Sequence, residues 1–522
     1  MERRQTRWNG WGNPGYDDPL AVNEPAWRWL TQAFAMPALL ATPPRDFSDV
    51  MLAPSRLPAR ARQKLTTLLG SFGVQQGDFE RARHAAGRGL TDLLRLRAGD
   101  LSAAPDVVLY PRNETDCLAA LMLCAELDIA IVPFGGGTGT ISVARDSHCA
   151  VAALDLSDLN RVTSVDLVSG TADAEAGILG PDLERQLAAR GIMLGHRPED
   201  FEFSSLGGWI VQPGAGQEAA RYGAVGDWLL GVRVATPRGL VTSGGLPDLK
   251  HIMPGSNGSL GVVTGATLRV RALPAQEAYH AYLFPDFASG LAAMRAFQRT
   301  GEPHAMLRLC DDGQTRFFRA LERAGREWNF RDHLFDIYLS VRRFESHAAR
   351  LLIGFAGSAE EISTAHKGFH RLAKRLGALP LGLDATWPER RFGTGYRRDT
   401  FLDRGAGMDS LELFVSWAKL PSVYVTMRGA LKQAMRQHAP RPSAHGLVFC
   451  HVGPARSDGA VLTFTWLYPR ILDDGVAQAD SIRRVALAVA ASLRAESEEL
   501  DREILRGIKQ TLDPTAVLPA IA

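Results

Sequence analysis

The chain has 522 residues, of which 46% are hydrophobic and 22% charged, and its formal net charge at pH 7 is +2. A chain of this length is too long for one hydrophobic core, so two or three domains are expected. The near balance of charge excludes the electrostatic signature of a nucleic-acid-binding protein, and the absence of a run of about 18 apolar residues excludes a predicted membrane span.

The cysteines and the first residues indicate the compartment. The five cysteines are odd in number and scattered, with no spacing typical of a metal site, so we expect free thiols, a reducing compartment and no bound metal. No hydrophobic segment follows the arginines of the first seven residues, so no secretory signal is predicted. We therefore expect a cytoplasmic protein, with peripheral contact to a membrane surface as an open alternative.

Residues 1–100 are expected to form an N-terminal arm followed by helices. The polar segment 7–12 contains Trp8 and Trp11. Two indole rings left in water would forgo several kcal/mol of burial, so the arm is predicted to dock against the body of the protein. Helical patterns follow at residues 25–35 and 79–97.

Residues 101–275 alternate strands, helices and glycine-rich loops. A strand at 107–110, a helix at 118–126 and a strand at 129–132 lead into the first loop. Further strands are expected at 151–154, 171–174, 229–236 and 266–270, and a helix at 181–190. This segment is predicted to form one domain.

The first loop runs from Pro133 to Thr140 and contains Gly135, Gly136 and Gly137. Without Cβ atoms, successive backbone amides can converge on an anion such as a phosphate, and the hydroxyls of Thr138 and Thr140 add donors. The alternative is a tight turn with no ligand. The loop matches neither the G-x-G-x-x-G fingerprint nor the P-loop, so a nucleotide here would be held in another way.

Two further loops are rich in glycine and hydroxyl groups, at 194–209 and 254–264. Each could be an irregular connection, but three such loops within 130 residues exceed what packing requires. We expect them to line one extended, phosphate-bearing ligand.

After Pro274 the pattern changes to two strand–helix–strand units, at 280–309 and 351–381, which predict an α+β domain with an antiparallel sheet over 276–468. The arginine-rich stretch 386–404 is either a solvated face or a site for an anionic substrate. Residues 469–522 are expected to be a helical segment, with one long amphipathic helix over 482–512.

The order and spacing of the three loops resemble the cofactor loops of vanillyl-alcohol-oxidase-type (PCMH-type) flavoproteins. Further motifs resemble the alkyl-dihydroxyacetonephosphate synthase family: Trp-Asn-Gly-Trp-Gly at 8–12, Gly-His-x-Pro at 195–198, Glu-Phe-Ser with Gly-Gly-Trp at 202–209, Tyr-Gly at 222–223 and Thr-Pro-Arg-Gly at 236–239. The resemblance implies an α+β protein with a two-subdomain PCMH-type FAD-binding domain, an α+β cap domain with an antiparallel sheet, an N-terminal arm and C-terminal helices.

The resemblance also implies FAD as cofactor and names its site. The cofactor-binding residues would be Pro133, Phe134, Gly135, Gly136, Gly137, Thr138, Gly139, Glu199, Asp200, Ser204, Ser205, Asn257, Gly258, Ser259, Leu260, Gly261, Val262 and Val263. The family exchanges the acyl group of acyl-dihydroxyacetone phosphate for a fatty alcohol, without net redox chemistry at the flavin. Its functional positions correspond here to His196, Arg308 and Arg398, and the Arg398 guanidinium would suit the substrate phosphate. A homodimer and non-covalent or covalent flavin are open.

Three departures from the family pattern stand against this match. The family tyrosine, thought to transfer protons, is Thr463 here, and a threonine hydroxyl is far less acidic than a phenol. The family's histidine cluster near the C-terminus is absent, since no histidine follows His451. The family's Thr-Arg-Ala-Ser segment is Gln-Pro-Gly-Ala at 212–215.

These departures leave three hypotheses. The first is an active ether-lipid synthase of the family type. The second is an FAD-linked oxidoreductase acting on a hydroxy acid or alcohol, which would depend on an electron acceptor. The third is a non-catalytic FAD-binding paralogue. His451 is either a replacement base or a strand histidine whose hydrogen bonds are satisfied. His366 and His370, at helical spacing, are expected at the surface. A metal site there would need a third ligand, and no residue in the sequence is a candidate for it.

Overall fold

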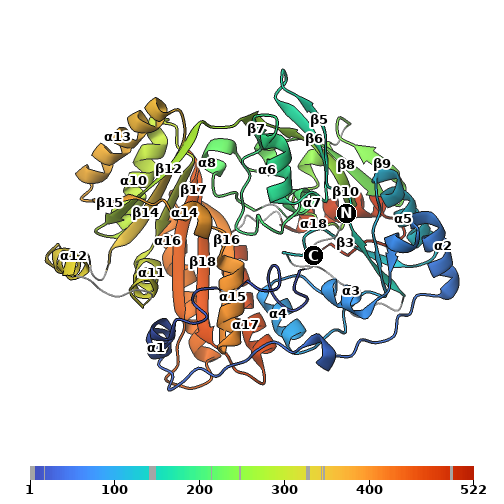
Figure 1. Cartoon of the computed structure of the whole chain (residues 1–522), viewed down its shortest axis with the longest axis horizontal. Coiled ribbons are helices and arrows are strands. Elements are labelled where there is room, and N and C mark those ends of the chain that lie inside the picture. Colours follow the sequence, from blue (N-terminus) through green and yellow to red (C-terminus); the bar gives the residue numbers. More distant parts are fainter. Residues whose placement is uncertain are drawn as a thin grey trace.

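The computed structural model describes residues 6–16, 18–139, 149–212, 214–245, 248–324, 330–342, 344, 347–493 and 498–521. Two regions with separate sheets are visible in Figure 1: a seven-stranded sheet on one side, and two smaller sheets on the other. The expected α+β class is confirmed.

The first small sheet carries the glycine loop. Its strand order is β1-β2-β4-β3, with β2, β4 and β3 parallel and β1 antiparallel. The strands are β1 (Val74–Gln75), β2 (Val107–Leu109), β4 (Val151–Asp155) and β3 (Ala130–Phe134). The helix α5 (Glu114–Glu126) links β2 to β3, and Asn113 caps it by accepting from the Asp116 amide. Because β3 and β4 are parallel, their carboxyl ends meet at the edge where the first glycine loop begins.

The second small sheet is antiparallel, in the order β5-β6-β10-β8-β9. Its strands are β5 (Val162–Asp166), β6 (Thr171–Glu175), β10 (Val262–Arg269), β8 (Leu229–Thr236) and β9 (Gly239–Thr242), and β7 (Ile192–Met193) pairs separately with β11 (Arg271–Ala272). The helices between them are α6 (Gly180–Ala188), α7 (Leu206–Val211), α8 (Ala219–Tyr222) and α9 (Val225–Trp228). Both small sheets contribute to one hydrophobic core.

The seven-stranded sheet has the order β15-β12-β14-β13-β17-β18-β16, and every pairing in it is antiparallel. Its strands are β12 (Gln276–Phe284), β13 (Met306–Cys310), β14 (Ala349–Gly357), β15 (Leu379–Leu383), β16 (Ala406–Ser416), β17 (Leu447–Ala455) and β18 (Gly459–Pro469). Its helices are α10 (Phe287–Thr300), α11 (Asp312–Ala324), α12 (Phe330–Val341), α13 (Ala359–Arg375), α14 (Trp387–Arg390), α15 (Thr394–Asp403) and α16 (Leu420–Gln437).

The two faces of the seven-stranded sheet differ. Leu309, Cys450 and Phe464, on three adjacent strands, are buried in a core shared with residues of α10, α13 and α16. Because strand side chains alternate between faces, Arg308 and His451 lie on the opposite face. That second face is the one available to the flavin-type loops.

The N-terminal region wraps the interface between these parts. Trp8 and Trp11 are buried, which confirms the predicted docking of the arm. The helices are α1 (Glu24–Ala33), α2 (Ala59–Leu69), α3 (Asp78–Arg83) and α4 (Leu90–Arg97). The single helix expected at 79–97 is wrong, because Gly87 and Gly89 interrupt it between α3 and α4. Arg88, between these glycines, donates to the backbone carbonyls of Gly10 and Arg7 in the arm.

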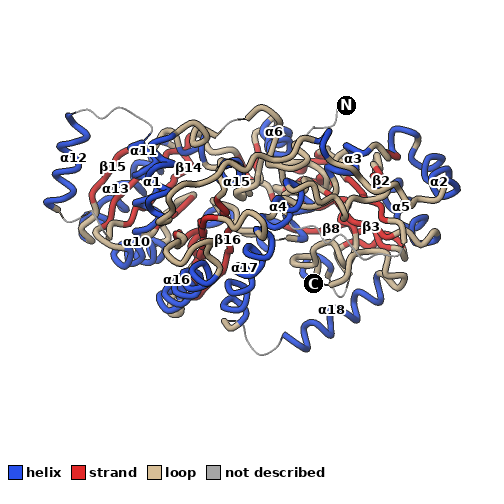
Figure 2. The backbone as a smooth tube through the Cα atoms, turned by 90° about the horizontal axis from the view of Figure 1, so that it is seen from below, coloured by secondary structure: helices blue, strands red, loops and turns tan. Residues whose placement is uncertain are grey.

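The C-terminal segment contains α17 (Gly475–Ala491) and α18 (Glu498–Leu512) in place of the one helix expected over 482–512, and residues 494–497 between them lie outside the described part. Figure 2 shows α18 beneath the sheets that carry β3 and β8. Beyond α18, the Ile131 amide of β3 donates to the Val517 carbonyl at 2.7 Å. No helix in the described ranges is long and apolar enough to cross a membrane.

Candidate flavin and substrate site

The three glycine-rich loops converge in space. A Cβ on Gly136 would lie 1.6 Å from the Phe203 carbonyl oxygen, and one on Gly135 would lie 2.2 Å from Ser205 Oγ. Gly258, whose φ is +78°, faces Pro133 at 3.3 Å. Only glycine permits the backbones to approach this closely, so the first loop is wedged between the other two.

A cavity of about 190 Å³ lies where the loops meet. Of the expected cofactor residues, fifteen line it: Pro133, Phe134, Gly135, Gly136, Gly137, Thr138, Gly139, Asp200, Ser204, Ser205, Asn257, Gly258, Gly261, Val262 and Val263. Glu199, Ser259 and Leu260 do not line it: Glu199 pairs with Arg308, Ser259 is buried, and Leu260 is in the core. Thr140 and Pro213, at the ends of two loop segments, lie outside the described residues.

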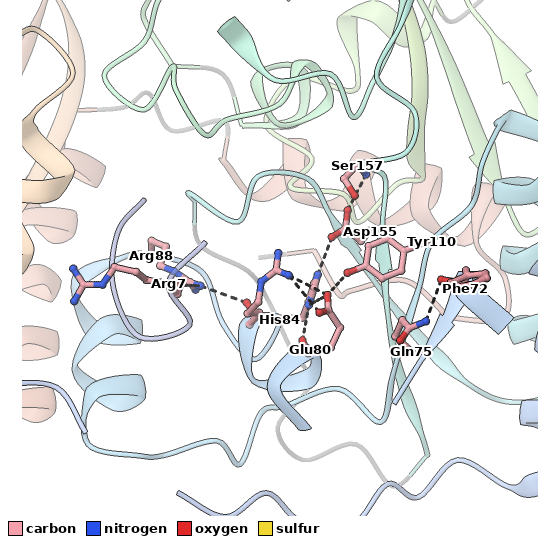
Figure 3. Close-up of polar contacts among 10 residues, drawn as sticks. Arg7, Phe72, Gln75, Glu80, His84, Arg88, Tyr110, Asp155 and Ser157 are labelled. Carbon is pink, nitrogen blue, oxygen red and sulfur yellow. Dashed lines mark hydrogen bonds and ion pairs between the residues drawn. The ribbon is translucent and has the colours of Figure 1, made fainter. Parts of the chain in front are cut away.

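A buried polar network supports the start of the first loop (Figure 3). His84 from the end of α3 stacks on Phe134 with ring centroids 4.3 Å apart, and its Nε2 lies 2.8 Å from Asp155 Oδ2 at the end of β4. Its Nδ1 lies 2.7 Å from the Glu80 carbonyl oxygen. Each ring nitrogen therefore lies against an oxygen that can accept a hydrogen bond. Tyr110 donates to the Glu80 carboxylate beside it.

His196 forms part of the cavity wall. Its ring packs between Trp209 and Trp228, with centroids 4.9 and 5.1 Å away. Neither ring nitrogen has a hydrogen-bond partner among the described residues, and burial lowers the pKa of His196 to about 3. The imidazole is therefore neutral, with two unpartnered polar atoms at the cavity.

Asp200 closes the polar side of the same cavity. Its carboxylate accepts from Thr138 Oγ1 at 2.6 Å, which ties the first loop to the second. Burial raises the pKa of Asp200, and the hydrogen bonds from Thr138 and Ser204 oppose that rise. Ser204 also accepts from Trp209 Nε1 at 2.7 Å.

Arg308 joins the cavity to the seven-stranded sheet. Its Nη1 lies 3.4 Å from Glu199 Oε1, and its Nη2 donates to His451 Nδ1 at 3.2 Å. Burial and the Arg308 charge hold the pKa of His451 well below its usual range, so this imidazole is neutral. Of the two interpretations of His451, the structure favours the partnered strand histidine.

Arg398 is a desolvated cation. It lies on α15 with its guanidinium carbon 5.6 Å from the Trp11 ring centroid, and its Nε is buried without a hydrogen-bond partner. Burial lowers its pKa, and Asp399, Asp409 and Asp200 oppose that effect from a distance. Within the described residues it makes no hydrogen bond or ion pair, which leaves it available for an anionic ligand.

A second cavity of about 330 Å³ begins at Arg308. It combines arginines with an apolar wall: its lining includes Arg308, Arg350, Arg390, Arg391 and Arg397 together with Leu20, Phe318, Leu321, Leu352 and Trp387. The stretch 386–404 is therefore not a uniform solvated face. Arg390 pairs with Asp384, whereas Arg397 approaches Asp18 only at 3.9 Å.

Glu218, which sequence reasoning missed, holds the two regions together. Its carboxylate is 1% exposed and pairs with Arg197 at 3.1 Å and with Arg391 at 3.0 Å. It also accepts from the Tyr279 hydroxyl on β12 at 3.0 Å. The neighbouring sequence has no motif that could have identified it, because its partners lie up to 173 positions away.

Two protein-family models match the chain. One describes an FAD binding domain and matches residues 105–245; the other describes the C-terminal domain of FAD linked oxidases and matches residues 273–520. The chain therefore contains both domains of an FAD-linked flavoprotein. The expected cofactor, FAD, is thereby supported for this flavoprotein.

The flavoprotein is also similar to individual proteins over most of its length. An alkyldihydroxyacetonephosphate synthase of Dictyostelium discoideum is 27% identical over 498 residues, 88% of this chain and 81% of the relative. One of Trypanosoma brucei brucei is 27% identical, covering 89% of this chain and 80% of the relative. A solved alkyldihydroxyacetonephosphate synthase structure superposes with a TM-score of 0.85 at 25% identity, covering 98% of this chain and 97% of that one.

The residues of the flavoprotein fit FAD. The glycines form a cradle that any Cβ would fill, and backbone amides at the cavity suit a pyrophosphate. Sequence reasoning missed several wall residues that have no distinctive motif: Leu156, Val211 and Pro519. Pro519 could not have been found, because the C-terminal segment reaches the cavity only through its pairing beside β3.

Proposed function

We propose that this flavoprotein exchanges the acyl group of acyl-dihydroxyacetone phosphate for a fatty alcohol. The observation that carries the proposal is the second cavity, whose lining combines arginines with apolar side chains. A substrate with a phosphate and a long acyl chain needs both. The relatives' names and the 27% identity over most of the chain support the same activity.

In this proposal the cations bind the phosphate. Arg398 has no hydrogen-bond or ion-pair partner among the described residues, and Arg308 is only loosely paired with Glu199 at 3.4 Å. A phosphate at either guanidinium would gain charge-assisted hydrogen bonds, and a bidentate contact fixes its orientation as well as its position. Leu20, Leu321 and Leu352 would exclude water from the chain of the substrate.

The flavin, when bound, supplies the electrophilic ring at which the substrate is held during exchange. His196 forms part of the pocket wall. It supplies no proton near neutral pH, because burial lowers its pKa to about 3. Residues 276–468 then form the substrate-binding domain, and residues 101–275 the FAD-binding domain. The proton that the alcohol loses must be accepted by another group.

The proposal is tested by product formation without oxygen. Purified flavoprotein is incubated anaerobically with palmitoyl-dihydroxyacetone phosphate and hexadecanol, and the ether product and released palmitate are quantified by mass spectrometry. We expect equal amounts of both with no electron acceptor added. Turnover of hydroxy acids that requires an artificial acceptor would instead identify an oxidoreductase, and bound flavin with no turnover would identify a non-catalytic paralogue.

A further inference from the structure

Strand register places three polar residues in one row across the seven-stranded sheet. His451 on β17 lies directly opposite Thr463 on β18, and Thr463 lies directly opposite Glu412 on β16. Directly opposed residues share a face, so the three side chains point the same way. Arg308 joins this face from β13, because Cys310, two residues later, is opposite His451.

The row faces the flavin-type loops. Thr463 and His451 are 3% and 4% exposed, and Arg308 reaches from beside them to Glu199. Glu412, on the edge strand β16, ends the row and is its exposed member. Its carboxylate lies near Glu199 and Asp200 and is reached by hydrogen bonding from the backbone of Ala215, which follows the cavity residue Gly214.

The surroundings of Glu412 suit a group that gains and loses a proton. Surrounding protein atoms desolvate its carboxylate, although the side chain keeps contact with solvent. Burial first, then the charge of Glu199 and to a smaller extent that of Asp200, raise the pKa of Glu412 to about 7, while Ala215 and Arg308 oppose the rise. It makes no ion pair with any described residue, so its carboxylate is not tied to a cation.

We propose that Glu412 is the proton-transfer group of the exchange reaction, in a chain whose neighbouring strand carries Thr463 where the family has tyrosine. This inference rests on the proposed function. Thr463 cannot serve, because its hydroxyl is too weakly acidic and is buried. His451 cannot serve either, because its Nδ1 is occupied by Arg308 and the ring is buried.

The step balances without any oxidant. The alcohol oxygen forms the new C–O bond of the ether and releases its proton to the Glu412 carboxylate. The ester C–O bond on the same carbon breaks, and the acyl group leaves as a carboxylate with the bonding electron pair. Glu412 then returns its proton to the leaving carboxylate or to water, so the chain is regenerated with no net transfer of electrons.

The test compares Glu412→Gln with the unchanged flavoprotein in the anaerobic ether-forming assay. We expect kcat to fall by about 100-fold or more, the usual range for loss of a general base or acid, with KM and bound flavin per chain unchanged. The limb of the kcat–pH profile near pH 7 should disappear. Glu360→Gln, a matched change on an exposed residue of α13, should leave both rate and profile unchanged.

Two further variants keep the result interpretable if Glu412→Gln loses flavin. Glu412→Asp retains a carboxylate one methylene shorter, and it should keep the pH limb at a reduced rate. Glu412→Gln combined with Thr463→Tyr should recover part of the lost rate, because the phenol would face the same cleft.

The outcomes separate the two proposals. Ether formation by Glu412→Gln at the unchanged rate and pH profile would overturn the role of Glu412 and leave the proposed function standing. Absence of ether formation by the unchanged, flavin-loaded protein at every pH would overturn both.

Discussion

The two sides of the site are the flavin-type loops and the face of the seven-stranded sheet that carries Arg308. They rely on different parts of the polypeptide, the backbone on one side and side chains on the other. On the flavin side, backbone atoms of three loops form the pocket. Contacts at Gly135 and Gly136 leave no room for a Cβ, and Gly258 has a φ of +78° that favours glycine. On the sheet side, the work falls to side chains brought into one row by strand register, from Arg308 on β13 to Glu412 on β16. The three loops on the backbone side keep the family pattern and the departure beside them is at 212–215, whereas the side-chain side departs from it at Thr463.

This difference suggests which side can change. A loop held by backbone contacts tolerates few substitutions, so cofactor binding persists. In a row of side chains across neighbouring strands, a residue can take over the chemical role of the residue opposite it, because opposed residues lie close together on one face. The predictions below test this contrast, starting with the largest effect.

Gly136→Val should abolish flavin binding. Even a Cβ at this position would meet the Phe203 carbonyl oxygen at 1.6 Å, so the first and second loops must separate. We expect purified protein without the visible flavin band and without activity. Gly226→Ala on α9, where a Cβ meets nothing within 4 Å, should retain a full complement of flavin. A flavin-loaded Gly136→Val protein would contradict the backbone account of this side.

Glu218→Gln should destabilise the contact between the two sides. The change leaves two arginines, Arg197 and Arg391, without their shared buried carboxylate. Removing one partner of a buried ion pair costs about 3–5 kcal/mol. Thermal unfolding, monitored by the release of flavin, should begin at a temperature well below that of the unchanged protein. Glu360→Gln should unfold at the same temperature as the unchanged protein. Coincident unfolding curves would show that this network does not join the two sides.

Arg398→Met should weaken substrate binding while sparing the flavin. A charge-assisted hydrogen bond is worth about 1.5–3 kcal/mol, so kcat/KM for the phosphate-bearing substrate should fall by about 10- to 100-fold. The loss should be smaller for a substrate analogue without the phosphate. An equal loss for both substrates would assign Arg398 a structural role beside Trp11.

We expect the smallest effect at a histidine cluster on β12 and α13. His280 stacks on His366 with centroids 3.7 Å apart, and Tyr282 hydrogen-bonds to His366 and His370. Burial first, then the charges of His366 and His370, lower the pKa of His280 from 6.5 to about 4. The unfolded chain therefore binds more protons between those values, and stability falls as pH drops from 6.5 towards 4.

His280→Gln should reduce that acid-dependent loss of stability. After discounting for solvent screening of this half-buried ring, we expect the fall in unfolding free energy between neutral and mildly acidic pH to shrink by on the order of 1 kcal/mol. Denaturant unfolding at both pH values measures it. An unchanged pH dependence would place the acid sensitivity elsewhere.

The sequence predicted the flavin side better than the sheet side, for a physical reason. A loop that needs backbone approach must contain glycine, so fifteen of the eighteen expected cofactor residues could be identified from local pattern and resemblance and do line the cavity. Arg308 was named only through resemblance, and Arg398 both through resemblance and as part of the arginine-rich stretch 386–404. Glu412 and Glu218 were missed, because strand register and contacts across the two regions leave no local signal in the sequence.

The helix predictions failed where glycines and tertiary contacts override periodicity. The apolar pattern at 79–97 keeps helical spacing, but Gly87 and Gly89 lie within it and separate α3 from α4. Arg88, between them, binds the carbonyls of Gly10 and Arg7 in the arm. His366 and His370 were expected at the surface and are instead partly buried, since both accept or donate a hydrogen bond with Tyr282.

The most direct test of the central claim, that the flavin pocket and the charged face of the sheet act on one substrate, is an anaerobic absorption spectrum. Flavin-loaded protein is mixed with palmitoyl-dihydroxyacetone phosphate in the absence of any electron acceptor. We predict that the oxidised flavin band bleaches and returns when hexadecanol is added. A band that is unchanged by the substrate would contradict the claim.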